Sequence, residues 1–250
     1  MATSSPSDAP TPEAFLAGAR VDPAVYELRP DYRAMLLAVD GLVPGPSDEA
    51  ADALLRRAET AATDALGPLG EVPPEQLPHV AAWRAAYRSF GAKPQRTRNS
   101  LEALVRRAVA SGLPRVNRIT DVYNAISVLH QLPIGGEDLT RYDGAPRLIR
   151  ATGAEAFDTT AGGEDVIEHP DPGEVVWCDD SGVTCRRWNW RQTRRTQLSE
   201  ETVTAFFILD ALDPMSDEAL LAAADDLVAQ LSLWAPTLSV AQRLLRADAA

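Results

Sequence analysis

The chain has 250 residues, of which 45% are hydrophobic and 24% are charged, so its composition is that of a globular protein and excludes an intrinsically disordered one. Acidic residues outnumber basic residues by 36 to 24, and the resulting net charge of -12 argues against broad binding to nucleic acids or anionic membranes. No segment approaches the roughly 18 consecutive apolar residues of a membrane span. We therefore expect a cytoplasmic protein with reduced cysteines and no membrane partner. From the negative net charge we also expect no DNA partner.

The first half of the chain is predicted to be mainly helical. Residues 1–14 are expected to form a disordered tail, because residues 1–12 are mostly Ser, Pro, Ala and Thr. The apolar run 33–43 fits either a short buried strand or a helix. Ser47 is expected to cap the first long helix, and Asn99 with Glu102 resembles a capping box. The four helices predicted in this half are 47–66, 74–89, 99–111 and 117–130.

The second half changes to strand-like patterns. A last helix is expected to begin after Ser216 and to end before Pro236, with an exposed helical tail over 236–250. Helices followed mostly by strands predict an α+β fold, with helices packed on a mixed, mainly antiparallel sheet in one domain over 15–235. The expected strands are 147–150, 174–178, 183–190 and 203–209, with a hairpin turn at 180–182.

The usual motifs of phosphate-binding loops, dinucleotide folds, hydrolase elbows and zinc proteases are absent from the sequence. The three histidines are isolated, so no local metal site is indicated and we expect neither metal nor cofactor. His130 is interpreted as a core residue with a satisfied ring, and His169 as an exposed loop residue. Cys178 and Cys185 would face each other across the hairpin, either as a redox pair or, as we favour, as two small buried hydrophobes.

The basic residues are concentrated in two stretches. Nine basic residues and one acid lie between Arg84 and Arg118, and five arginines with no acid lie between Arg186 and Arg195. Together these stretches carry a net charge of +13, which leaves -25 for the rest of the chain. Ion pairs with the acidic remainder and a local phosphate-binding surface account for this pattern equally well.

Two further patterns indicate a polar site. On a strand, alternation would place Trp188 and Trp190 on one face, for core packing or ring stacking. The other face would carry Arg187, Asn189 and Arg191. The exposed arginines would then pair with acids or bind carboxylate or phosphate. One face of the helix 117–130 carries a row of uncharged polar side chains, which either form hydrogen bonds with neighbouring backbone groups or line a pocket for a polar ligand. The stripe consists of Thr120, Asn124, Ser127 and Gln131.

These residues resemble the tRNA-editing module of the phenylalanyl-tRNA synthetase beta subunit, called B-three/B-four. Free-standing versions of the module are the most similar, because they share the run 187–191. The resemblance covers about 87–209, and at its widest extent the whole folded part from about 15 to 233. The segments that carry it are Arg98-Asn-Ser-Leu-Glu-Ala-Leu104, Leu113-Pro-Arg-Val-Asn117, Asp121-Val-Tyr-Asn124, Leu132-Pro133 and Arg187-Trp-Asn-Trp-Arg191.

The resemblance implies a compact α+β fold whose helix and sheet enclose a pocket for the aminoacylated 3′ end of tRNA. Asn124 matches the asparagine of the synthetase's Asp-x-x-Asn helix and is our catalytic candidate. Arg186, Arg187 or Arg191 could hold the terminal phosphate. The substrate-binding candidates are Thr120, Ser127, Gln131, Arg187, Trp188, Asn189, Trp190 and Arg191, and the RNA-contact candidates are Arg96, Arg98, Arg106 and Arg107.

Two positions depart from the synthetase pattern. Gly135 or a neighbour takes the place of the histidine after the proline, and the synthetase's Gly-Gly-Glu falls near 189–191. The resemblance therefore carries over no amino-acid specificity. It implies no aminoacylation either, because the catalytic synthetase core is absent from this chain.

We therefore predict binding of the tRNA acceptor end, or of an aminoacyl-adenosine-like ligand, with deacylation of a mischarged amino acid. An aminoacyl ester is already activated, so positioning a water and stabilising the oxyanion suffice for hydrolysis. Two alternatives stay open: a module that binds an RNA end, an amino acid or a nucleotide without turnover, and a pocket for a small acidic metabolite.

Overall fold

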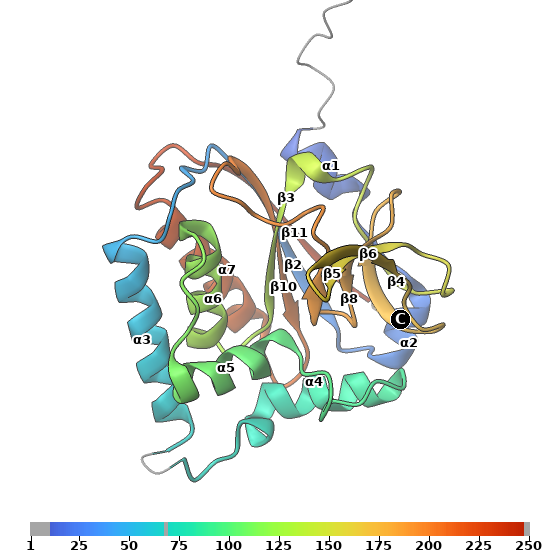
Figure 1. The fold of residues 1–250 in the computed structure, drawn as a ribbon, viewed down its shortest axis with the longest axis horizontal. Helices are drawn as coiled ribbons and strands as arrows, with labels where there is room; N and C mark the ends of the chain where they lie inside the picture. The colour runs from blue at the N-terminus through green and yellow to red at the C-terminus, as the bar shows by residue number, and fades with distance from the viewer. Residues whose placement is uncertain (1–10, 68–69, 248–250) are drawn as a thin grey trace, which may run out of the picture.

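The computed structural model describes residues 11–67 and 70–247, and it confirms the α+β fold (Figure 1). A four-stranded antiparallel sheet in the order β11-β2-β10-β3 lies at its centre. Its strands are β2 (Arg33–Asp40), β3 (Ile134–Asp138), β10 (Thr204–Ala211) and β11 (Ser239–Arg246).

The inner strands of this sheet are buried on both faces, so their sequences are continuous apolar runs rather than alternating ones. In β2, Leu37 and its odd-numbered neighbours pack against helices, whereas Leu36 and its even-numbered neighbours pack against a second layer. The run 33–43, for which the sequence allowed either a strand or a helix, therefore contains a strand. Phe206 and Phe207 divide in the same way between the two cores in β10.

Helices cover one face of the central sheet (Figure 1). α6 and α7 pack on it, α3 packs against α6, and α5 packs against α3 and α6. The bounds are α3 (Glu49–Ala65), α5 (Ser100–Ser111), α6 (Arg118–Leu129) and α7 (Asp217–Leu231). The predicted caps of α5 and α7 are confirmed, since the side chains of Asn99 and Ser216 each accept a backbone N–H of the first turn, and Asn117 caps α6 in the same way.

The other face of the central sheet is covered by a second, five-stranded sheet in the order β1-β4-β7-β8-β9, in which only β1 and β4 are parallel. Three helices complete this layer, and β5 pairs with β6 as a separate hairpin. The helices and one-turn segments are α1 (Pro12–Gly18), α2 (Pro23–Leu28), η1 (Pro74–Gln76), α4 (Pro78–Ser89) and η2 (Leu139–Arg141). The strands are β1 (Arg20–Val21), β4 (Arg147–Arg150), β5 (Phe157–Ala161), β6 (Glu164–Glu168), β7 (Val175–Cys178), β8 (Val183–Arg186) and β9 (Arg191–Gln192).

Several boundaries differ from the prediction. Asp48, not Ser47, caps α3, because its carboxylate accepts from Ala51 N–H at 3.0 Å. Helix α1 already begins at Pro12, inside the range expected to be a tail, while residues 1–10 lie outside the described part of the chain. Within the described ranges, none of the helices is long and apolar enough to cross a membrane.

The expected helical tail after Pro236 is wrong, because Ser239–Arg246 form edge strand β11. All eight residues pair with β2, and the alternation of the strand places Ala241 and Leu245 in the core between the two sheets. Pairing with the buried strand β2 thus determines the secondary structure of this segment, although its own residues are compatible with a helix.

Candidate functional site

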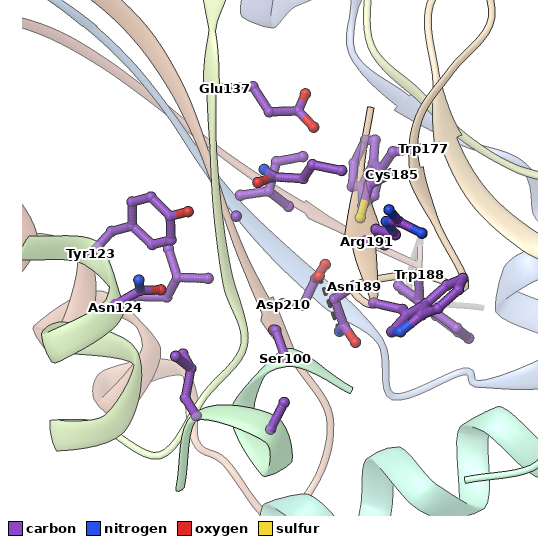
Figure 2. A pocket seen from close by; sticks show the side chains of 17 residues that line it. Ser100, Tyr123, Asn124, Glu137, Trp177, Cys185, Trp188, Asn189, Arg191 and Asp210 are labelled. Carbon is purple, nitrogen blue, oxygen red and sulfur yellow. Dashed lines mark hydrogen bonds between the residues drawn. The ribbon is translucent and has the colours of Figure 1, made fainter. Parts of the chain in front are cut away.

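A cavity of about 250 Å³ lies between the helical layer and the second sheet (Figure 2). Figure 2 shows Tyr123 and Asn124 of α6 on one side, with Asn189 and Arg191 across the cavity and Glu137 of β3 at its upper end. The 17 lining residues are Ser100, Ala103, Leu104, Tyr123, Asn124, Ile134, Gly135, Glu137, Trp177, Cys185, Trp188, Asn189, Trp190, Arg191, Gln192, Ile208 and Asp210. We call this space the main cavity.

The wall opposite α6 is built by a turn and not by the strand predicted over 183–190. β8 ends at Arg186, and both Arg187 and Trp188 have positive φ angles, 48° and 67°, so the alternation of faces inferred for this run is wrong. Trp188 is fully buried against Tyr32 and Trp83, with ring centroids 5.0 and 5.4 Å away. This aromatic packing holds the turn in its left-handed conformation and directs the following residues into the main cavity.

Asn189 joins the turn to the central sheet through buried hydrogen bonds. Its Oδ1 accepts from Tyr87 OH at 3.0 Å, and its Nδ2 donates to Asp210 Oδ2 at 3.2 Å. The other oxygen of Asp210 accepts from Tyr32 OH at 2.6 Å. Burial nevertheless raises the pKa of Asp210 to about 7, since these donors offset only part of the cost of desolvating the carboxylate.

The polar side chains along α6 differ in role: some form hydrogen bonds with nearby backbone, and one lines the main cavity. Ser127 Oγ donates to Leu132 O at 2.6 Å, and Gln131 Nε2 donates to Val128 O at 2.7 Å, so these side chains satisfy local backbone and do not line the main cavity. Thr120 does not line it either. Asn124 does: it is 8% exposed, and its amide makes no hydrogen bond with any described residue.

Glu137 is a site residue that sequence reasoning missed. It is fully buried on β3, and one carboxylate oxygen, Oε2, accepts from Tyr142 OH. Burial raises its pKa to about 7, against the lowering effect of the Tyr142 bond. An available signal was an acid directly after two glycines in an otherwise apolar segment. Gly136 is required there, because a Cβ would lie 2.8 Å from the Tyr123 ring and 2.9 Å from Leu198.

The arginines near the main cavity have three different environments. Arg186 is buried and makes two hydrogen bonds to Glu174, at 2.9 and 2.8 Å, so it is structural and not a phosphate ligand. Arg187 stacks 4.5 Å over the Trp190 ring and donates to Thr97 Oγ1 at 2.6 Å. Arg191 lies at the rim of the main cavity, forms no ion pair with the described residues, and donates from its guanidinium to Thr160 O at 3.1 Å.

Arg187 does not line the main cavity but a second cavity of about 380 Å³ behind the Trp188 wall. Lys93 and Arg96 also line it and have no ion pair within the described residues. Of the other RNA-contact candidates, Arg98 lies 3.6 Å from Glu102 and Arg106 lies 3.0 Å from the same carboxylate, whereas Arg107 is exposed and unpaired there. The two carboxylate-bound arginines are thus less available to a phosphate than Arg96.

The remaining sequence candidates are structural. Cys178 and Cys185 are free and buried, and they are not opposite each other, because the register pairs Cys185 with Trp177. Burial raises the pKa of both thiols. His130 is half-buried with its ring 2.9 Å from Asp226, and His169 is exposed. In the described ranges, no group of three or more His, Cys, Asp or Glu side chains is placed to hold a metal ion.

Comparison with known proteins relates this arrangement to a family. A family model described as the B3/4 domain matches residues 82–225. No curated protein matches the chain. Among solved structures, it is similar to an N-terminal fragment of the phenylalanyl-tRNA synthetase beta subunit from Pyrococcus horikoshii, at 13% identity and a TM-score of 0.43. That match covers 89% of this chain and 49% of the fragment, so the chain spans about half of the fragment's length.

Proposed function

The chain belongs to the B3/4 domain family, and from that premise we propose that it binds the aminoacylated 3′ end of tRNA and hydrolyses the ester of a mischarged amino acid. The observation that carries the proposal is Asn124, whose side-chain amide makes no hydrogen bond with the described residues and faces a partly polar cavity. Because no protein group occupies this amide, its N–H donors and its oxygen are free to bind a polar ligand in the cavity. Because the substrate is charged tRNA, we place the activity in the cytoplasm.

In the proposed reaction, the ester carbonyl lies against Asn124, whose Nδ2 donates to the oxygen on which negative charge develops. The aminoacyl ester is already activated, so a water held in the main cavity can attack it without a protein nucleophile. Trp190, half-buried in the wall, offers an aromatic face to the terminal base, and Arg191 at the rim offers a cation to its phosphate.

The test is a deacylation assay with the full chain on a panel of misacylated tRNAs. We expect one or more tRNAs to release amino acid, and Asn124→Ala to lower the rate constant about 100-fold, the usual cost of losing an oxyanion donor. Gln131→Ala is the matched control, because Gln131 belongs to the same stripe but its amide bonds Val128 O outside the main cavity. Release that Asn124→Ala leaves unchanged would contradict the catalytic role.

A second candidate function is binding of the same RNA end without turnover. It is favoured by the composition of the cavity wall, which contains no histidine and whose thiol, Cys185, has a pKa raised well above its usual value by burial. Saturable, salt-sensitive tRNA binding without any release of amino acid across the panel would select this function.

A further inference from the structure

One oxygen of Glu137 has no hydrogen-bond partner although the side chain is completely buried. Oε2 accepts from Tyr142 OH, whereas Oε1 has no donor among the described residues. Glu137 lines the main cavity, and Figure 2 shows its carboxyl group at the end of the cavity away from Ser100. The free oxygen is thus a covered acceptor that belongs to a residue of the cavity wall, next to the space in which we place the ligand.

Among the described residues, no donor meets hydrogen-bond geometry with this acceptor. The amide of Gln192 is close enough to lower the pKa of Glu137, but its Nε2 donates to Gly136 O at 3.0 Å. The other acid of the wall, Asp210, has both oxygens filled by Tyr32 and Asn189. The nearby guanidinium of Arg195 bonds Asp179, and no cation within the described residues forms an ion pair with Glu137. An unpaired buried carboxylate oxygen costs more than a buried neutral group, so a ligand that brings a positive N–H donor gains most from this wall.

We infer that Glu137 holds the α-ammonium group of the aminoacyl moiety, so that the site takes aminoacyl esters with a free amino group and rejects N-acylated ones. This inference rests on the proposed function, which places the aminoacyl group in the main cavity. The α-ammonium is the cation that aminoacyl esters have in common, whatever their side chain. It is attached two bonds from the ester carbonyl carbon, so the groups that hold the two must converge on one cavity, as Glu137 of β3 and Asn124 of α6 do.

N-acylation would oppose binding in two ways. It removes the positive charge and two of the three N–H donors, so that Glu137 can receive at most one neutral amide N–H in place of a charge-assisted bond. It also adds bulk inside a cavity of about 250 Å³, whose walls include the buried rings of Trp177 and Trp188. Charge and volume therefore select against peptidyl and formylated esters together.

The experiment uses adenosine analogues whose 3′ position carries an aminoacyl group through a stable amide, each prepared with a free and with an acetylated α-amino group. The series covers small, aliphatic, aromatic and hydroxyl-bearing side chains, and Kd is measured by calorimetry at pH 7 on the full chain. We expect acetylation to weaken the best-binding analogue at least 30-fold. Glu137→Gln should weaken the free-amine form about 10-fold or more and reduce the preference for it to less than 3-fold.

Glu168→Gln is the control variant. It removes one negative charge from β6, where Glu168 pairs with Arg186 at 3.0 Å outside the main cavity, and it should leave both affinities unchanged. Glu137→Gln keeps the shape of the side chain and an acceptor for Tyr142, and its folding is checked by thermal unfolding. Equal affinity for free and acetylated forms, or a preference that Glu137→Gln leaves intact, overturns the inference while the proposed function stands. Binding of none of the analogues overturns both.

Discussion

At the scale of single residues, Asn189 shows how one amide shapes the site. Its side chain bridges Tyr87 and Asp210, and the backbone carbonyl of the same residue accepts from Ser100 N–H at 3.0 Å at the start of α5. We expect Asn189→Ala to lower the free energy of unfolding by about 2 kcal/mol or more, because it leaves two buried partners short of a hydrogen bond. Urea unfolding would measure this. Asn124→Ala is the matched comparison. A similar loss of unfolding free energy in that variant would show that the Asn124 side chain does have a hydrogen-bond partner in the folded protein.

Glu137 offers a second residue-scale prediction, which concerns pH. Burial raises its pKa to about 7 from an ordinary 4.5, so between about pH 4.5 and 7 the folded chain holds a proton that the unfolded chain has lost. Its contribution to the free energy of unfolding therefore becomes less favourable as the pH rises, by about 3 kcal/mol across the window. We expect Glu137→Gln to gain stability relative to the wild type as the pH rises from 4.5 to 7.5. Urea unfolding curves that stay parallel across this range would refute the assignment.

At the scale of elements, His79 ties three of them together. Its Nδ1 lies 2.8 Å from Gln131 O after α6, and its Nε2 accepts from Leu212 N–H at 3.0 Å after β10, so the ring is neutral with its proton on Nδ1. Burial lowers its pKa to about 4, and below about pH 6.5 the unfolded chain therefore takes up a proton that the folded chain excludes. We expect His79→Ala to be destabilising, by an amount that is largest above pH 6.5 and shrinks toward pH 4. Chemical unfolding at several pH values measures it, and a constant difference would contradict the neutral ring.

The elements also show which parts of the fold the sequence determines locally. α5 and α7 were predicted from cap residues that form the expected bonds, and α6 and β4 were also predicted at nearly their observed positions. The run 187–190 was mispredicted because an aromatic cluster distant in sequence holds Trp188 at a positive φ. β11 was mispredicted because its partner β2 lies about 200 residues earlier.

The residues of the candidate site also fall into two groups, those that local sequence motifs reveal and those that only the tertiary fold reveals. Asn124 and the residues at 188–191 could be found from their own motifs, and the structure brings them together around the main cavity. The buried acids Glu137 and Asp210 could not, since their importance arises from burial between layers that only the tertiary fold creates.

At the scale of the whole molecule, charge is balanced locally over most of the basic stretches. Nine of their fourteen cations form ion pairs with acids in the described chain. The five without one are Arg88, Lys93, Arg96, Arg107 and Arg191. The net +13 inferred from the sequence is therefore mostly neutralised, and the part left for a phosphate backbone is small and lies mainly between the end of α4 and α5.

Lys93 and Arg96 are the best placed of these cations, because both line the second cavity beside Arg187, whose guanidinium stacks on the Trp190 wall of the main cavity. If a tRNA end enters the main cavity, a phosphate of the same strand can reach them. We expect the double variant Lys93→Glu/Arg96→Glu to weaken tRNA binding at least 10-fold and to lower the slope of log Kd against log salt by about one for each cation.

The control for this prediction is a second double variant with the same change in net charge. Arg20 and Arg57 are also exposed and without ion pairs in the described chain, but they lie on β1 and α3, away from both cavities. Arg20→Glu/Arg57→Glu should change the affinity less than 3-fold if contact is local, because solvent-exposed charges beyond about 10 Å are largely screened at 0.1 M salt. Equal losses in the two variants would show that tRNA senses the total charge of the molecule, and the second cavity would then have no special part in binding.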